Sequence, residues 1–301
     1  MFDQIFGNYL VSSGYLSSDD LNDVIESEKQ VRVKLGLIAV TEKLMTKEQA
    51  DEVNQLQAMM DKRFGDIAVE KGYLTDEQVG RLLKKQGNIY MLFVQTLIDK
   101  NLMTLDEIDM MLGRFQSMEG FSDSEMDDLV SGDIDRVISL YLPENSELGI
   151  RHCGIVIRSF LRLISSYAYV SKAYMVDELV ADNFAMQPLA GDHKLQAGFA
   201  GAGNSLLMIA NPFCQESFEV VDMDALDAVG EFINCVNGLF ASSLSTEGVD
   251  VDMEVPQFYD KKSRISGKEF IVFPIHVQDQ VINFVLSIDS EYQVEEYQTE
   301  E

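Results

Sequence analysis

Three polar residues in the segment 222–246 have types and spacing that could support chemistry. Asp227, Glu231 and Asn234 follow one another at intervals of four and three residues. An α-helix turns by about 100° per residue, so these side chains and Gly238 should lie within an arc of about 60°. The apolar residues of the same segment repeat at intervals of three and four and should form the buried stripe on the other side. They are Leu226, Val229, Ile233, Val236 and Phe240.

This helix carries residues that weaken helices. Asn234, Asn237 and Gly238 each cost roughly 0.5–1 kcal/mol relative to Ala in a helix interior. For Asp227 and Glu231 alone, an ordinary solvated helix face is the simpler interpretation. With Asn234 exposed beside them and Gly238 leaving space, we predict that the face contacts a partner. Asn237 lies about 80° from the centre of the stripe and could frame that contact.

The segments around this helix predict an α+β domain. A long, largely buried helix is expected over 148–169, and a strand over 173–180. Residues 195–210 have a Gly-rich middle without a Lys at Walker spacing, which favours a tight hairpin turn over a phosphate-binding loop. Three further strands, of an antiparallel sheet with helices packed on it, are expected. They cover 249–259, 268–277 and 280–289, and the acidic tail 290–301 is expected to fray.

The first third of the chain repeats with a period of 29 residues. Each copy has a turn position where a residue with positive φ can end a helix, and then Ser or Thr with an acid or amide three residues later. The turn positions are Gly14, Lys43, Gly72 and Asn101, and the capping pairs are Ser17/Asp20, Thr46/Gln49, Thr75/Gln78 and Thr104/Glu107. Each copy is therefore predicted to be a pair of helices. The predicted domains are the all-helical repeats over 1–117, a connection that could hold a short helix over 118–145, and the α+β domain over 146–301.

Charge and composition exclude several classes of function. The formal net charge of −28 is spread over both halves of the 301-residue chain, which should repel nucleic acid and anionic lipid. The sequence contains neither an apolar run of about 20 residues nor a secretory signal, so we expect no membrane insertion and a cytoplasmic location. The three Cys residues are far apart, which argues against disulfides and zinc and predicts buried thiols. The scattered His residues likewise show no metal-ligand spacing.

The polar helix and its flanks resemble the CheX and CheC phosphatases of bacterial chemotaxis. The motif of that family is Asp or Ser, three residues, Glu, two residues, Asn, and a Pro about 23 residues later. Here the motif is Asp227, Glu231, Asn234 and Pro256, flanked by "FAGAGNSLLMIA", "NCVNGLF" and "VDMEVP". A single complete motif makes CheX the nearer resemblance.

The resemblance implies an activity. It implies a CheX-like sheet and hydrolysis of the phospho-aspartate of a response-regulator receiver domain such as CheY. Asn234 would position water and Glu231 would pair with a receiver Lys, with Asp227, Gly238 and Pro256 in support. No metal or cofactor of the chain's own is implied, because the receiver would bring Mg²⁺. The open alternatives are a receiver-docking scaffold without catalysis, which could be a homodimer, and a regulator that responds to cyclic di-GMP.

The repeats resemble the MshEN domain of type II secretion and type IV pilus ATPases. Some MshEN domains bind cyclic di-GMP, which makes seven residues of copies two and three candidates for nucleotide binding. These are Arg63, Gly65, Gly72 and Gln86 in copy three, and Lys34, Gly36 and Gln57 in copy two. Lys43 stands where the motif has a Gly, and the outer copies lack the Arg and the Gln. A purely structural or docking role for the repeats is the alternative.

Overall fold

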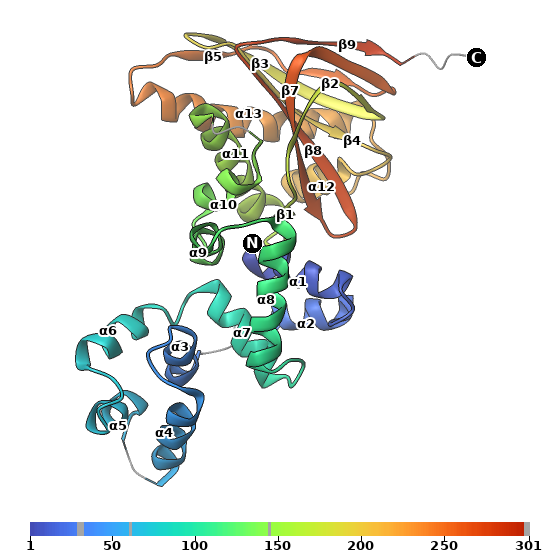
Figure 1. The fold of residues 1–301 in the computed structure, drawn as a ribbon. Helices are drawn as coiled ribbons and strands as arrows, with labels where there is room; N and C mark the ends of the chain where they lie inside the picture. The colour runs from blue at the N-terminus through green and yellow to red at the C-terminus, as the bar shows by residue number, and fades with distance from the viewer. Residues whose placement is uncertain (29–32, 60–61, 144–145, 298–301) are drawn as a thin grey trace. The chain divides into compact units, whose positions relative to one another are not determined.

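The computed structural model describes residues 1–28, 33–59, 62–143 and 146–297 (Figure 1). It divides into two compact units: a helical one, Phe2–Gly132, and a second, Asp133–Glu301 with Met1, that carries the sheet. The predicted combination of helical repeats followed by an antiparallel sheet with helices is confirmed. Within the described residues, no helix has the length and apolar character needed to cross a lipid bilayer.

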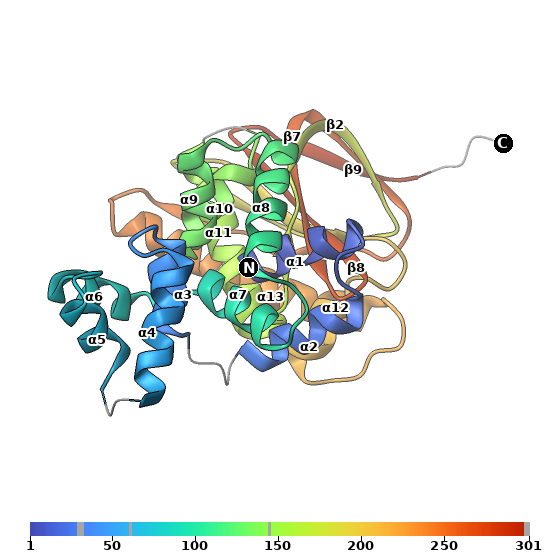
Figure 2. The ribbon, with the colours of Figure 1, turned by 60° about the horizontal axis from the view of Figure 1, so that its bottom comes forward.

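Each predicted repeat of the helical unit is a pair of helices. Helices α3 to α6 pack together, while α1 and α2 pack against α7 and α1 also packs against α8 (Figure 2). The helices are α1 (Phe2–Ser12), α2 (Ser18–Glu28), α3 (Leu35–Thr41), α4 (Lys47–Met59), α5 (Phe64–Glu70), α6 (Asp76–Lys84), α7 (Ile89–Asp99), α8 (Leu105–Glu119) and α9 (Asp123–Ser131).

The turn within each pair has the predicted conformation. All four turn residues have positive φ, from 56° at Lys43 and Asn101 to 71° at Gly72 and 75° at Gly14. At the start of α6, the Gln78 amide nitrogen donates to the Thr75 hydroxyl, and the Thr75 amide nitrogen donates to Oε1 of Gln78. The other three pairs make the same reciprocal bonds, so the local sequence sets the start of each second helix.

The second unit is built on one nine-stranded antiparallel sheet. Its strands follow the order β1-β7-β8-β4-β3-β5, with β2 and β9 also paired to β7 and β6 to β3. The strands are β1 (Tyr169–Val170), β2 (Tyr174–Ala181), β3 (Asn183–Gly191), β4 (Leu195–Gly201), β5 (Val251–Met253), β6 (Gln257–Tyr259), β7 (Ser263–Val277), β8 (Gln280–Ile288) and β9 (Tyr292–Glu296). The helices are α10 (Ile134–Tyr141), α11 (Glu147–Ser159), the π-helical turn η1 (Phe160–Ile164), α12 (Leu207–Cys214) and α13 (Met223–Ser245).

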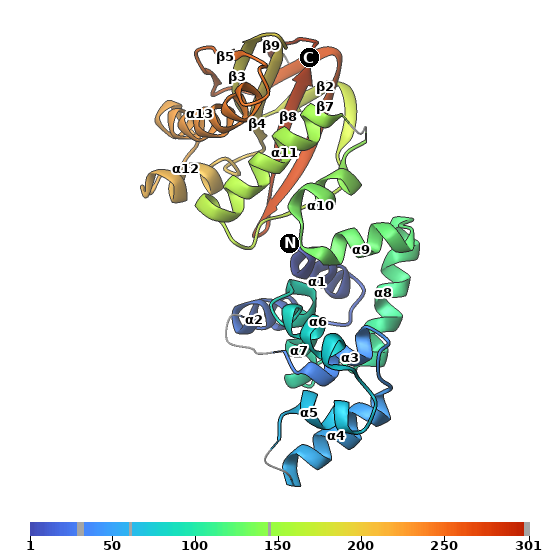
Figure 3. The same cartoon turned by 90° about the vertical axis from the view of Figure 1, so that its left-hand side faces the viewer.

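The two faces of this sheet are covered differently. Helices α11 and α13 pack on one face, α13 against β3 and β4 and α11 against β8 (Figure 3). The other face closes on itself, because the 15-residue strand β7 pairs with β8 along one part and with β9 along another. Phe184, Phe270 and Tyr292 are buried in that fold of the sheet. Each face therefore has its own apolar core.

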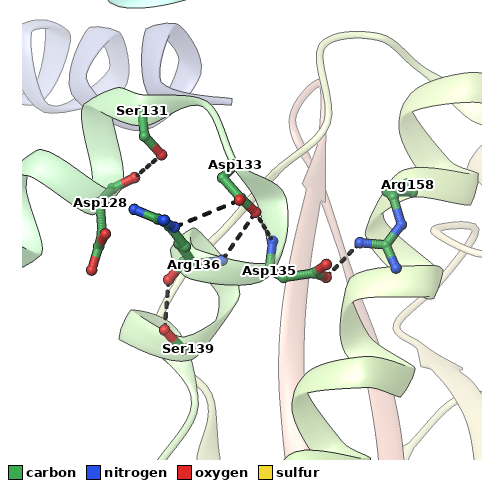
Figure 4. Close-up of polar contacts among 7 residues, drawn as sticks. All are labelled: Asp128, Ser131, Asp133, Asp135, Arg136, Ser139 and Arg158. Atoms are coloured by element: carbon green, nitrogen blue, oxygen red, sulfur yellow. Dashed lines mark hydrogen bonds and ion pairs between the residues drawn. The ribbon is translucent and has the colours of Figure 1, made fainter.

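The first turn of α10 is tied to α11 by charge (Figure 4). Asp133 caps α10 by accepting bonds from the amide nitrogens of Asp135 and Arg136. The carboxylate of Asp135 pairs with Arg158 on α11. Gly154 of α11 faces this pair, and a Cβ there would collide with the Asp135 carboxylate.

Several expected elements differ from the structure. Residues 195–210 are not a hairpin, since β4 ends at Gly201 and α12 begins at Leu207. Ser205 accepts a bond from the Ala202 amide nitrogen and so forms the turn that starts the helix. The tail is not frayed over Tyr292–Glu296, which pairs with β7, while 298–301 lie outside the described residues.

Three other predicted segments differ in extent or content from the elements of the structure. The predicted connection, described over 118–143, is largely helical and holds the end of α8 and all of α9 and α10; residues 144 and 145 lie outside the described residues. The long helix expected over 148–169 ends as an α-helix at Ser159 and continues as η1 only to Ile164. The strand expected over 249–259 is two short strands, β5 and β6, with a break at 254–256.

Lys43→Gly should stabilise the helical unit. Lys43 is exposed and holds the left-handed conformation that Gly adopts at the equivalent positions of copies one and three. Because a non-Gly residue pays steric strain there, we expect a gain of about 1 kcal/mol in the free energy of unfolding. Thermal and urea denaturation followed by circular dichroism would measure it. Gly72→Lys is the reciprocal variant and should lose stability; equal effects of the two substitutions would contradict this explanation.

Candidate functional site

Helix α13 forms as its sequence predicts. Asp222 is the N-cap, and its Oδ1 accepts a bond of 3.0 Å from the Ala225 amide nitrogen. All five residues of the predicted apolar stripe are at most 1% exposed. On the other side lie Asp227, Glu231, Asn234 and Gly238, which we call the α13 face. Asp227 and Glu231 are exposed and Gly238 is half-buried.

Asn234 is held by the sheet. The sequence predicts an exposed side chain, but in the structure it is half-buried. Its Oδ1 accepts a hydrogen bond of 3.1 Å from Nε2 of Gln187, a residue of β3 that is 1% exposed. The Asn234 side chain therefore lies at the surface with its Oδ1 held by a buried residue.

Asn237 belongs to the core, so the expectation that it frames a surface contact is wrong. It is completely buried between α11 and the sheet. Its Nδ2 donates to Oε1 of Gln187 at 2.9 Å, and its Oδ1 lies 2.9 Å from Nε2 of His152 on α11. Asn237 therefore links His152 to Gln187, and through Gln187 to Asn234.

His152 ends this chain of buried polar groups. It is fully buried and stacks on Phe240 with ring centroids 4.2 Å apart. Among the described residues its Nδ1 has no hydrogen-bond partner. Burial lowers the pKa of His152 to about 4. The imidazole is therefore neutral at neutral pH and serves as a structural hydrogen-bond donor.

The break between β5 and β6 borders the α13 face. The carbonyl oxygen of Glu254 accepts a bond of 2.8 Å from Nε2 of Gln187, and the Glu254 amide nitrogen donates to the Pro188 carbonyl. Pro256 follows in this break, near Gly230 of α13. The ring of Phe258 packs so closely on Gly230 that a Cβ there would lie 2.5 Å from it. Pro256 thus shapes the edge of the site, near Gly230, and makes no hydrogen bond to Asn234.

Gly238 is not required by the packing of the domain. A Cβ at this position would lie 3.7 Å from the Met253 side chain, an ordinary contact distance. Apolar side chains are exposed beside the α13 face and in the break that borders it. Met253, next to Gly238, is 40% exposed, and Val255 in the break is 80% exposed. The face thus combines two carboxylates and an amide with an apolar rim.

Metal and thiol chemistry gain little support from the residues around the α13 face. Among the residues that the structure describes, no group of three or more His, Cys, Asp or Glu side chains could hold a metal ion. The cysteines are free; Cys153 is buried as expected, but Cys214 and Cys235 are exposed, contrary to expectation. Burial and the carboxylates of Glu216, Asp227 and Glu231 raise the pKa of the Cys214 thiol, which makes it a poor nucleophile.

Two of the seven nucleotide-binding candidates lie around one cavity. Lys34 and Gly36 line a cavity of about 630 Å³ in the helical unit, together with Lys47, Gln95 and other residues of copies two and four. The other five candidates are absent from its lining. Two of them lie beside the segment that carries Lys34 and Gly36: Gly65 packs on Val79 and adjoins Leu35, and Gln86 donates to the Val33 carbonyl at 2.8 Å. Arg63 is the exposed N-cap residue of α5 and makes no side-chain capping bond, Gly72 forms a turn, and Gln57 donates to the Lys62 carbonyl at 3.4 Å.

A family model matches part of the second unit. Residues 184–276 match the family model described as Chemotaxis phosphatase CheX. No curated protein matches the chain significantly. A solved CheC-like superfamily protein from Shewanella sp. PV-4 is 18% identical, with 48% of this chain and 99% of that chain covered and a TM-score of 0.43.

Two further solved structures are similar over a comparable share of this chain. The chemotaxis protein CheX from Desulfovibrio desulfuricans is 14% identical, with 48% of this chain and 99% of that chain covered and a TM-score of 0.42. The complex of CheX with CheY, BeF3 and Mg²⁺ from Borrelia burgdorferi is 17% identical, with 46% and 95% covered and a TM-score of 0.34.

Acid should destabilise the second unit through His152. In the unfolded chain this residue takes up a proton below a pH of about 6.5, but in the fold only below about 4, so stability is lost as pH falls between these values. From pH 7 to pH 5 the loss due to His152 should be about 2 kcal/mol. Urea unfolding at both pH values, followed by methyl NMR signals from residues 147–288, would show it. In His152→Phe that part of the acid sensitivity should vanish; an unchanged difference between the two pH values would contradict the assignment.

Proposed function

We propose that the second unit is a phosphatase that hydrolyses the phospho-aspartate of a response-regulator receiver domain in the cytoplasm. The observation that carries the proposal is the Asn234 amide, anchored to Gln187 and reaching the surface one turn from the exposed carboxylate of Glu231. The match of residues 184–276 to the chemotaxis phosphatase family supports it. Binding of a receiver is the broader part of the proposal, and hydrolysis by Asn234 is the finer part.

The reaction demands little chemistry from this chain. A water molecule attacks phosphorus in line with the acyl-phosphate bond, that bond breaks, and inorganic phosphate and the receiver's Asp carboxylate are released. The receiver's own Mg²⁺ and Lys would neutralise the phosphoryl oxygens. What remains is to hold the water, and positioning alone can accelerate a reaction strongly. A neutral amide such as Asn234 suits this role, because a carboxylate would repel the phosphoryl group.

The remaining groups of the α13 face would dock the receiver. Glu231 is exposed and can pair with a Lys at the receiver's active site, and Asp227 adds negative charge one turn before it. The exposed side chain of Met253 offers apolar area beside Gly238, which leaves room for the approaching backbone, and Val255 adds apolar area in the neighbouring break. Without hydrolysis, the same surface would act as a receiver-docking scaffold, either as a monomer or as a homodimer.

Nucleotide binding by the helical unit is a second candidate function. The cavity lined by Lys34 and Gly36 favours it, since it combines a cation with apolar walls. Lys34 already pairs with Asp99 at 2.8 Å, which a phosphate would have to displace. Titration of the full chain with cyclic di-GMP in a calorimeter decides the matter, with Lys34→Ala and Arg63→Ala as variants. Absence of heat at tens of micromolar ligand would remove this candidate.

Asn234→Ala should abolish acceleration of receiver dephosphorylation. Receiver domains from the same genome, phosphorylated with a small phosphodonor and Mg²⁺, would be mixed with the protein, and release of phosphate would be timed. Loss of one water-positioning group should lower the rate by about 10²-fold or more while the receiver still binds. Glu231→Lys should instead weaken binding, because it reverses the charge that meets the receiver.

Ser242→Ala, an exposed substitution on the same helix, is the matched control and should leave the rate unchanged. Equal rates for Asn234→Ala and the wild-type chain would refute the catalytic role. Receiver binding without any acceleration by the wild-type chain would leave the docking scaffold as the function.

A further inference from the structure

One chain of hydrogen bonds connects the core to the site, and a single backbone atom sets its direction. The chain runs from His152 through Asn237 and Gln187 to Asn234, and Gln187 also contacts the Glu254 carbonyl. A carbonyl oxygen can only accept. The terminal atom of Gln187 that lies 2.8 Å from it must therefore be the donor Nε2.

Every other amide orientation follows from that one. The same Nε2 of Gln187 faces Asn234, so the atom that it meets must be the acceptor Oδ1. The other terminal atom, Oε1, then faces Asn237 and requires the donor Nδ2 there. Asn237 consequently turns its Oδ1 to His152, which must carry its proton on Nε2. The bare Nδ1 of His152 and its lowered pKa agree with this neutral form.

The orientation matters most at Asn234. Because Oδ1 of Asn234 faces Gln187, Nδ2 of Asn234 has no partner within the described part of the chain. Both of its N–H groups are therefore free to donate to a bound molecule. Oδ1 retains one lone pair beside them. The free end of Asn234 therefore offers two donors and one acceptor position. A donor can bond a phosphoryl oxygen while the acceptor holds a proton of the attacking water, so the amide can position that water against the phosphoryl group.

We infer that Gln187 is a positioning residue that fixes the amide of Asn234 with its nitrogen outward. The inference rests on the proposed function. Gln187 is 1% exposed and lies behind Asn234, so it acts through Asn234 and not by touching a receiver. A freely rotating Asn234 would present oxygen and nitrogen about equally, and a phosphoryl group would meet the wrong atom in part of the molecules.

The first test is NMR spectroscopy of the free, full-length protein with ¹⁵N-labelled Asn and Gln side chains. Asn234→Asp, Asn237→Asp and Gln187→Glu identify the three amide signals by their loss. The amide protons of Gln187 and Asn237 should be protected from exchange with water, and those of Asn234 should exchange rapidly. Protected Asn234 protons or rapidly exchanging Gln187 protons would overturn the orientation, whatever the protein does to receivers.

The second test uses Gln187→Glu and single-turnover dephosphorylation of a phosphorylated receiver from pH 6 to pH 9. A protonated carboxyl group at this position can still donate one bond, whereas an ionised one can only accept and must reverse the Asn234 amide. The rate relative to wild type should therefore fall by up to about tenfold per pH unit above the pKa of the new group. Asn237→Asp is a comparison variant that changes the buried chain one bond further from Asn234.

The third test separates turnover from docking. Gln187→Met, of similar size, should lower the turnover rate while the affinity for the receiver stays unchanged, because the exposed surface is intact. A flat pH ratio for Gln187→Glu, or an unchanged turnover rate for a folded Gln187→Met, would refute the positioning role. If the wild-type chain accelerates no receiver, the proposed function fails, and the NMR result still decides the orientation.

Discussion

The structure of the second unit depends on the hydrogen bonds that satisfy the buried amide of Gln187. A buried polar group left unpaired costs about 1–3 kcal/mol, and this side chain makes three hydrogen bonds at once. To satisfy it, β3, α13 and the break between β5 and β6 must come together in one register. Asn237 extends the same requirement to α11 through His152. The same hydrogen bonds therefore hold the core elements together and place Asn234 at the surface.

That arrangement gives the surface its character. The residues that weaken helix α13 have separate roles. Asn237 bonds to Gln187 inside the core, and Asn234 bonds to Gln187 from the surface. Gly238 has no packing duty inside the domain, which fits a role toward a partner. In the proposed function the chain contributes geometry and the receiver contributes the charged chemistry, so a strongly acidic protein can act on a phosphorylated partner without cations of its own at the site.

Local features could be predicted from the sequence, and distant pairings could not. Helical periodicity and the Asp222 cap identified α13, and the Thr75/Gln78 pair and its equivalents identified the repeats, because these interactions span three or four residues. The β9 strand was mispredicted because its pairing with β7 is not visible in the local sequence. The turn before α12 was mispredicted as well: besides the local Ser205 bond, the Gly203 amide nitrogen donates to the Asp182 carboxylate, 21 residues earlier. Gln187 was missed in the otherwise apolar stretch "FAMQPLA". A lone amide in an apolar strand was a sign that it has a buried polar partner elsewhere in the chain.

A structure of this chain bound to a receiver domain that carries BeF₃⁻ and Mg²⁺ in place of the phosphoryl group tests the central assignment most directly. The predicted result places the Asn234 side chain within about 3 Å of the BeF₃⁻ group or of a water in line with it, with Glu231 on a receiver Lys. A receiver bound elsewhere, with the α13 face open to solvent, would contradict the assignment.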